Sequence, residues 1–196
     1  MPKIVDHDYY RQELLSKCFE LFADKGYAAI TMRQIAQGLG VSTGTLYHYF
    51  SSKQVLFEQL VEELVESDLH RATAELKDVQ TLEKRIDKAF GFISRNQESF
   101  FKEALILADF YQQQQREGQK PSDALRQAYL RFERSMLELL GINDPELNIF
   151  LLSLIDGLIW QQVYGFGHVD YKAQAKLLTK MLSAYLKQNG YKIDEF

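Results

Sequence analysis

Residues 31–50, TMRQIAQGLGVSTGTLYHYF, carry the most specific pattern in the chain and predict two short helices. Thr31 can cap the first helix, and Gln34 three residues later completes a capping box. A turn around Gly40 ends that helix, and Ser42 can cap the second one. Two short helices joined by a glycine-containing turn form the helix-turn-helix pattern.

In a helix-turn-helix, the second helix enters the DNA major groove by its N-terminal end. This chemistry requires small polar residues at that end, so that the backbone can approach phosphates, and hydrogen-bond donors along the exposed face. The residues that meet these needs are Ser42, Thr43, Gly44, Thr45, Tyr47, His48, Tyr49 and Lys53. Three alternatives stay open at this point: Tyr47 or Tyr49 as a packing aromatic, Ser42 as a plain helix cap, and His48 as an incidental surface residue.

The charge pattern agrees with a local site for nucleic acid. The chain has 196 residues and a formal net charge of −4, which argues against a protein that coats nucleic acid indiscriminately. However, no Asp or Glu occurs between Asp24 and Glu58. We call residues 25–57 the acid-free window; it carries Lys25, Arg33 and Lys53. A surface that faces phosphates must avoid carboxylates, so the window favours DNA binding.

The order GVSTGTLYHYFSSK closely resembles the TetR family of bacterial transcriptional regulators. The residues that carry the resemblance are Phe22, Gly26, Tyr27, Thr31, Ile35, Ala36, Gly40, Val41, Ser42, Gly44, Leu46, Tyr47, Tyr49, Phe50, Lys53 and Leu56. The resemblance covers about residues 8–60, which we call the headpiece. It implies an all-α, homodimeric repressor.

The resemblance also implies roles for single residues of the headpiece. Those expected to point toward bases or nearby phosphates are Thr43, Thr45, Tyr47 and His48. Those expected to contact the phosphate backbone are Ser42, Gly44, Tyr49 and Lys53. Arg33, in the preceding helix, matches a position that often contacts DNA.

Apolar residues recur with helical spacing along nearly the whole chain, which predicts an all-α fold of about nine helices. The predicted helices cover about residues 8–25, 32–39, 43–49, 53–77, 82–93, 97–115, 122–140, 145–164 and 171–188. Ser51 or Ser52 can cap the long helix that begins at Lys53. We expect a DNA-binding domain over residues 1–58 and a helical effector-binding and dimerisation domain over residues 59–196.

The segment 146–167 is apolar almost all round and therefore predicts a helix that is buried on every side. Burial against a second subunit is one explanation, and an internal core is the other. The resemblance implies that the last two long helices, 145–165 and 170–189, form the interface of a homodimer. Asp156, in the middle of the segment, is either an anchor for a cationic or hydroxyl-bearing ligand or a hydrogen-bonding group of that interface.

An aromatic and apolar stretch, residues 99–114, could wall a cavity for a small hydrophobic effector, since helix bundles place such pockets between helices. The candidate lining residues are Phe101, Leu105, Phe110, Tyr111, Asp156, Trp160 and Tyr164. The alternative for each aromatic residue is plain core packing.

Other function classes find no support in the sequence. The four histidines have no metal-ligand spacing, and Cys18 is the only cysteine, so we expect no metal site, no disulfide and a small core residue at Cys18. Motifs of enzyme chemistry are absent, so we expect neither a catalytic residue nor a cofactor. The first ten residues have no apolar stretch, and no segment is long enough to span a membrane, so we expect a cytoplasmic protein. The expected partners are a palindromic DNA operator, a second copy of the chain and an unknown small hydrophobic effector.

Overall fold

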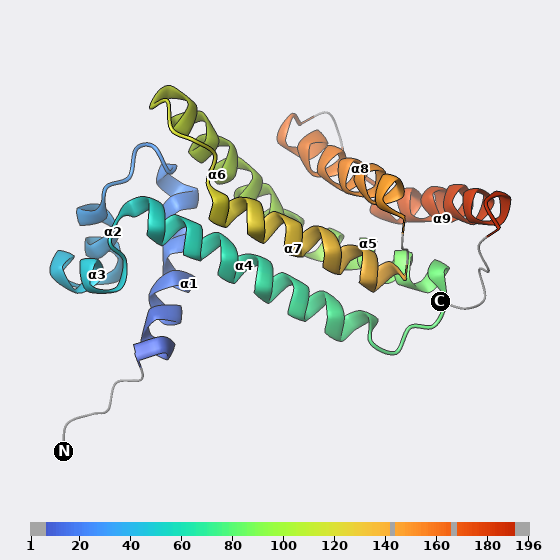
Figure 1. The fold of residues 1–196 in the computed structure, drawn as a ribbon, viewed down its shortest axis with the longest axis horizontal. Helices are drawn as coiled ribbons and strands as arrows, with labels where there is room; N and C mark the ends of the chain where they lie inside the picture. Colours follow the sequence, from blue (N-terminus) through green and yellow to red (C-terminus); the bar gives the residue numbers. More distant parts are fainter. Residues whose placement is uncertain (1–6, 142–143, 166–167, 191–196) are drawn as a thin grey trace, which may run out of the picture. The chain divides into compact units, whose positions relative to one another are not determined.

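The computed structural model describes residues 7–141, 144–165 and 168–190, and all regular structure within these ranges is helical (Figure 1). The helices are α1 (His7–Lys25), α2 (Met32–Leu39), α3 (Thr43–Tyr49), α4 (Lys53–Leu76), α5 (Leu82–Arg95), α6 (Gln97–Arg116), α7 (Asp123–Leu140), α8 (Pro145–Val163) and α9 (Tyr171–Gln188). The predicted all-α class and the predicted helices are confirmed over these residues. The first six residues and the end of the segment 146–167 lie outside the described residues.

Side-chain caps explain why the short helices of the headpiece begin where they do. The Gln34 amide N–H donates to Thr31 Oγ1 (3.3 Å), and the Thr31 N–H donates to Gln34 Oε1 (2.9 Å), so the predicted capping box is present. Gly40 ends α2 at φ +70°, a conformation that favours glycine. Ser52, rather than Ser51, caps α4, because the Val55 N–H donates to its hydroxyl (3.1 Å).

The chain forms two compact units, and three helices run from one into the other. The first unit holds the chain up to Ser67 together with Leu105–Tyr129, and the second holds Asp68–Ala104 together with the chain from Leu130 onward. The headpiece thus shares its unit with the second half of α6 and the start of α7. A functional boundary after residue 58 stays a prediction.

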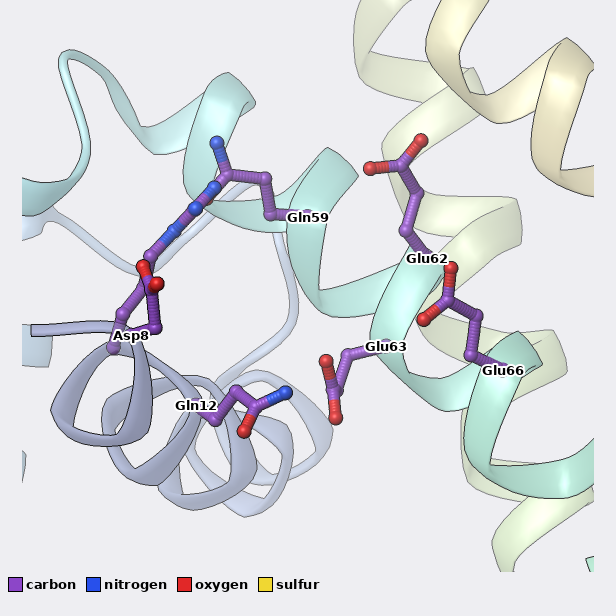
Figure 2. A pocket seen from close by; sticks show the side chains of 7 residues that line it. Asp8, Gln12, Gln59, Glu62, Glu63 and Glu66 are labelled. Carbon is purple, nitrogen blue, oxygen red and sulfur yellow. The ribbon is translucent and has the colours of Figure 1, made fainter. Parts of the chain in front are cut away.

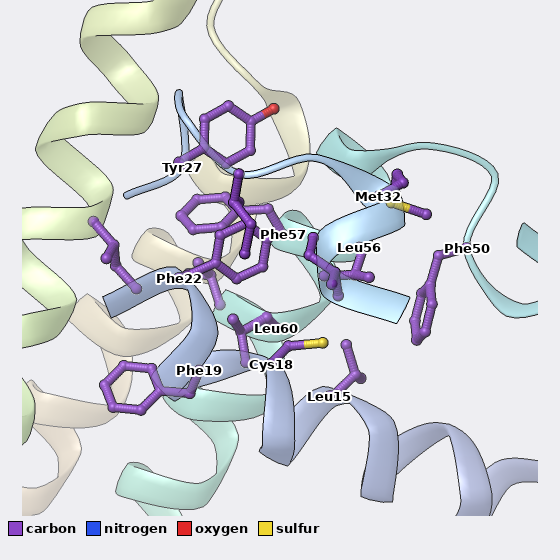
Figure 3. Close-up of a cluster of buried hydrophobic side chains, with 14 of the residues drawn as sticks. Leu15, Cys18, Phe19, Phe22, Tyr27, Met32, Phe50, Leu56, Phe57 and Leu60 are labelled. Carbon is purple, nitrogen blue, oxygen red and sulfur yellow. The ribbon is translucent and has the colours of Figure 1, made fainter. Parts of the chain in front are cut away.

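The core of the first unit is a group of buried side chains, mostly on α1, α2, α3 and α4, joined by residues of α6 and α7 (Figure 3). The rings of Phe22 and Phe57 meet edge-on with centroids 5.3 Å apart, and Phe57 stacks on Phe110 at 4.7 Å. Cys18 is completely buried among these residues, and burial raises the pKa of its thiol to about 12. Cys18 is therefore a packing residue, as the sequence indicates.

In the second unit, α5 packs along α9, and residues of α8 complete the core. Several of its buried positions follow helical spacing, including Ala175, Leu178, Leu182 and Leu186 on α9. The same two C-terminal helices also leave large apolar side chains in the open. These are Ile149 and Phe150 on α8, and Leu177, Met181 and Tyr185 on α9. A single copy of the chain therefore does not bury α8 on every side, and burial against a second subunit, one of the two explanations open from the sequence, stays a prediction.

Candidate nucleic-acid interface

The N-terminal end of α3 presents small polar residues on an open surface. The Ser42 hydroxyl accepts the Thr45 N–H (2.9 Å) and also pairs with the Thr45 hydroxyl (2.8 Å), which fixes the first turn. Ser42 and Gly44 are exposed, and Thr43 and Thr45 are half-buried. A Cβ at Gly44 would meet only the Ser42 hydroxyl, at 3.7 Å. This end of α3 therefore leaves room for a polar partner to approach the backbone.

The later part of α3 exposes two aromatic hydrogen-bonding side chains. Tyr47 is 50% exposed, and His48 is also exposed, whereas Leu46 between the helices is fully buried. An exposed Tyr47 cannot be a packing aromatic of the headpiece core. The two side chains offer a phenol and an imidazole to solvent, both of which can bond to phosphates or base edges.

Tyr49 is half-buried and takes part in contacts with α1. Its hydroxyl bonds His7 Nδ1 (3.0 Å), and its ring meets the edge of the Tyr10 ring at a centroid distance of 5.5 Å. Tyr49 thus links the end of α3 to the start of α1 while its hydroxyl lies near the surface. Sequence reasoning missed His7 here, since nothing in its local pattern signals a contact 42 residues away.

The two cations expected at the interface occupy different surroundings. Arg33 is exposed on α2. The Lys53 ammonium donates to the carbonyl oxygens of Tyr27 (2.7 Å) and Ile30 (2.9 Å) and lies 4.4 Å from the centre of the Tyr27 ring. Burial lowers the pKa of Lys53, and the charges of Glu117 and Asp109 oppose that effect. Lys53 therefore ties the α1–α2 loop to the start of α4.

Another surface of the first unit carries the opposite charge. An open pocket of about 260 Å³ lies between α1 and α4, and its lining residues are Asp8, Arg11, Gln12, Gln59, Glu62, Glu63 and Glu66. Figure 2 shows the carboxylates of Glu62, Glu63 and Glu66 following one another along α4. The Arg11 side chain donates to Gln59 Oε1 (3.1 Å). Because four carboxylates repel phosphate, this surface is unsuited to a duplex, and the acid-free window is left as the candidate interface.

The residues predicted to line an effector cavity fall in both units. In the first unit Phe110 is fully buried, with the Phe57 and Tyr27 rings each 4.7 Å away, whereas Leu105 and Tyr111 are 40% and 44% exposed. In the second unit Phe101 and Trp160 are half-buried, and Asp156 and Tyr164 are exposed. The Trp160 and Tyr164 rings lie 6.1 Å apart.

Sequence reasoning gave no role to two acidic residues of the second unit, the buried Asp68 on α4 and the half-buried Glu103 on α6. Asp68 is 7% exposed and pairs with Arg71. Burial raises the pKa of Glu103 to about 8, the Asp68 charge adds to the effect, and the Ser99 hydroxyl and Arg71 oppose it. The available signal was an acidic residue within the apolar helical stretch 99–114, which holds Asp109 as well. Within the described residues no group of three His, Cys, Asp or Glu side chains could hold a metal ion, and no helix could span a membrane.

Comparison with known proteins agrees with this arrangement. Residues 14–60 match the family "Bacterial regulatory proteins, tetR family". The chain is 28% identical over 201 residues to the HTH-type transcriptional regulator BetI of Rhizobium meliloti (strain 1021). The aligned region covers 97% of this chain and 96% of that protein. The N-terminal segment of the chain is thus a TetR-family DNA-binding segment, and the chain over nearly its whole length is similar to a DNA-binding transcriptional regulator.

Solved structures of low sequence identity share the fold. One is a regulator from Saccharomonospora viridis in complex with choline, with a TM-score of 0.68 and 21% identity over 90% of this chain and 97% of that one. Another is FadR from Bacillus subtilis in complex with stearoyl-CoA, with a TM-score of 0.63 and 20% identity over 89% of this chain and 97% of that one. Over about nine-tenths of the chain, the fold is thus similar to that of these two solved regulators.

Proposed function

We propose that the protein is a repressor that binds a palindromic operator as a homodimer and leaves it when a small hydrophobic effector binds. The observation that carries the DNA-binding part is the first turn of α3. It combines an exposed, capped and carboxylate-free N-terminus with open Tyr47 and His48 side chains. Such an end can enter the major groove while helix N–H groups meet phosphate.

The proposed DNA contacts are those predicted from the sequence. They are Arg33, Ser42, Thr43, Gly44, Thr45, Tyr47, His48, Tyr49 and Lys53. Lys53 has two N–H groups directed at loop carbonyls, so its main contribution is to hold the loop, and its charge supplements the field toward phosphate. Arg33 and Tyr47, which are exposed, contribute direct contacts.

A second copy of the chain is the proposed cover for the exposed apolar residues of α8 and α9. Ile149 is 63% exposed, and Leu177 and Met181 are 52% and 50% exposed. Burial of such side chains is worth about 25 cal/mol per Å² of apolar surface, which favours association in water. Asp156 lies exposed on α8, which supports a hydrogen bond in the dimer interface over a ligand anchor. A two-fold dimer would present two α3 helices about 34–36 Å apart, one turn of DNA.

The proposed effector site lies in the second unit, among residues of the expected set that are half-buried there, Phe101 and Trp160. Half-buried aromatic side chains can be covered further by an apolar ligand. The two fold neighbours that hold stearoyl-CoA and choline support a ligand site in this class of helical domain. We place this action in the cytoplasm, where a bacterial regulator meets its operator.

The DNA-binding proposal is tested by a gel shift with the promoter fragment beside the protein's own gene. The expected result is a specific complex whose affinity falls linearly with salt on a logarithmic scale. Binding to no such fragment, or binding that salt does not weaken, would contradict the proposal.

The effector proposal is tested by the fluorescence of Trp160, the only tryptophan in the chain. Stearoyl-CoA and choline serve as probes of an apolar and a cationic ligand. The proposal expects the apolar probe to change the emission with saturation and to release the DNA complex at the same concentrations. Saturable release by choline alone would reject a hydrophobic effector.

A further inference from the structure

The loop between α1 and α2, Gly26 to Ile30, is held by side chains from two distant helices. From α6, Asp109 Oδ2 accepts the backbone N–H of Ala28 at 2.9 Å, across 81 residues of sequence. From the start of α4, Lys53 Nζ donates to the carbonyls of Tyr27 and Ile30. All of these residues belong to the first unit.

The approach of Asp109 to this loop is closer than ordinary packing. Gly26 has φ +75°, and a Cβ built there would lie 2.9 Å from Asp109 Oδ2. Only glycine can take this conformation and still leave room for the carboxylate. Gly26 and Asp109 therefore fit each other, and Gly26 has a role beyond ending α1.

Aromatic packing extends the same contact. The Tyr27 ring meets the edge of the Phe110 ring at a centroid distance of 4.7 Å and carries the Lys53 ammonium on its face. Asp109 and Phe110 are neighbours on α6, so one turn of α6 makes both the polar and the apolar contact. Tyr27 lies between the cation of α4 and the ring of α6.

Plain stability does not require the Asp109 contact. Ala28 is exposed, so water could satisfy its N–H without the carboxylate. The contact instead fixes the orientation of the loop, because a hydrogen bond to a charged acceptor is short and directional. The loop continues straight into α2 and the turn before α3. Its orientation therefore sets that of α3, the helix proposed to enter the major groove.

We propose that Asp109 is a positioning residue for operator binding, the point at which α6 fixes the direction of the helix-turn-helix. This inference rests on the proposed repressor function. Asp109 lies on the part of α6 that belongs to the first unit, so its contact with the loop is internal to that unit. Asp109 touches no DNA, and its effect passes through the Ala28 amide and the loop.

The test compares Asp109→Ala with Asp109→Asn, which keeps an acceptor oxygen of the same shape. Asp123→Ala is the matched control: it removes the same charge from an exposed position of the same unit, where Asp123 pairs only loosely with Arg126 (3.5 Å). Operator binding, binding to random-sequence duplex and the salt dependence of both are measured at equal protein concentration. Amide hydrogen exchange of the loop is recorded alongside.

The expected result is about a tenfold loss of operator affinity for Asp109→Ala, with unchanged binding to random duplex and an unchanged salt slope, because no phosphate contact is lost. Exchange at the loop accelerates in Asp109→Ala. Asp109→Asn recovers most of the affinity, and Asp123→Ala binds like wild type. If Asp109→Ala does not fold, Asp109→Ser, which shortens the side chain, serves with the same expectation.

Two results would overturn the inference while leaving the repressor function intact. One is wild-type operator affinity in Asp109→Ala. The other is an equal loss for operator and random duplex together with a lowered melting temperature, which a merely structural role predicts. A wild-type protein that binds no operator would overturn the repressor function itself and the inference with it.

Discussion

The headpiece and the C-terminal helices use their apolar residues in opposite ways. In the headpiece, Leu46 and Phe50 are fully buried, and the exposed surface of the acid-free window is polar. In the second unit, α8 and α9 leave Ile149 and Leu177 exposed, while partial burial raises the pKa of Glu103. The headpiece has a complete core and offers a polar surface, which suits DNA. The C-terminal helices are incomplete as a single copy, which suits a protein partner.

The largest expected effect is the loss of stability when the core of the headpiece is disrupted. Phe50→Ala removes a fully buried ring at the end of α3. We expect a loss of about 3–5 kcal/mol in the free energy of unfolding, because the cavity cannot fully collapse. Urea unfolding followed by circular dichroism measures it. Tyr129→Ala, at an exposed aromatic position of the same unit, is the control. An equal loss of stability in that variant would contradict a special role of the buried Phe50 ring in the core.

The next effect concerns the apolar surface of α9. Leu177→Glu with Met181→Glu places two carboxylates on the proposed dimer interface, where burial of unpaired charge is costly. We expect a monomer by light scattering and a fall in operator affinity of at least about 100-fold, since one headpiece then binds alone. Lys172→Glu, exposed on the same helix, is the control. A double variant that stays dimeric would show that another surface pairs the chains.

A smaller change probes the polar surface of α3. Tyr47→Ala removes an exposed phenol and no core contact. We expect operator affinity to fall about tenfold, near 1–3 kcal/mol, with little change in stability. Tyr111→Ala, a comparably exposed tyrosine of α6, should bind like wild type. Equal gel-shift midpoints for the two variants would take Tyr47 out of the interface.

The smallest expected effect is on the pH dependence of stability, to which Glu103 of the second unit contributes. Glu103 has a folded-state pKa of about 8 against an ordinary value of 4.5, so between these values the folded chain binds more protons than the unfolded chain. Stability therefore falls as pH rises from about 4.5 to 8. Glu103→Gln should flatten this dependence by at least about 1 kcal/mol between pH 5.5 and 8.5, as one pKa unit is worth about 1.4 kcal/mol.

Urea midpoints at the two pH values measure the flattening. Glu98→Gln, an exposed glutamate on the same helix, is the matched control and should keep the wild-type slope. If both variants kept the slope, the pH dependence would belong to other groups.

The headpiece was predictable because its signals are local. Thr31, Gly40 and Ser42 each contact residues no more than four positions away, so the order of residues predicts their geometry. The contacts of Lys53 and Asp109 with the α1–α2 loop were not predictable, because they join residues 23 to 81 positions apart.

The second unit was predictable in its helices and less so in its surfaces. Apolar periodicity predicts which residues form α8 and α9. However, the sequence pattern is the same whether an apolar residue faces its own core or another chain. Ile149 and Leu151 are both large aliphatic residues of α8, yet they are 63% and 3% exposed. The raised pKa of Glu103 likewise depends on Asp68, which approaches from another helix.

The central claim is that two copies of the acid-free window read one DNA operator. A hydroxyl-radical footprint of the intact protein on its bound promoter fragment tests it most directly. The account predicts two protected half-sites of related sequence, centred about one helical turn apart, both lost in the Leu177→Glu, Met181→Glu variant. A single protected patch without two-fold symmetry, or protection that survives in that variant, would contradict it.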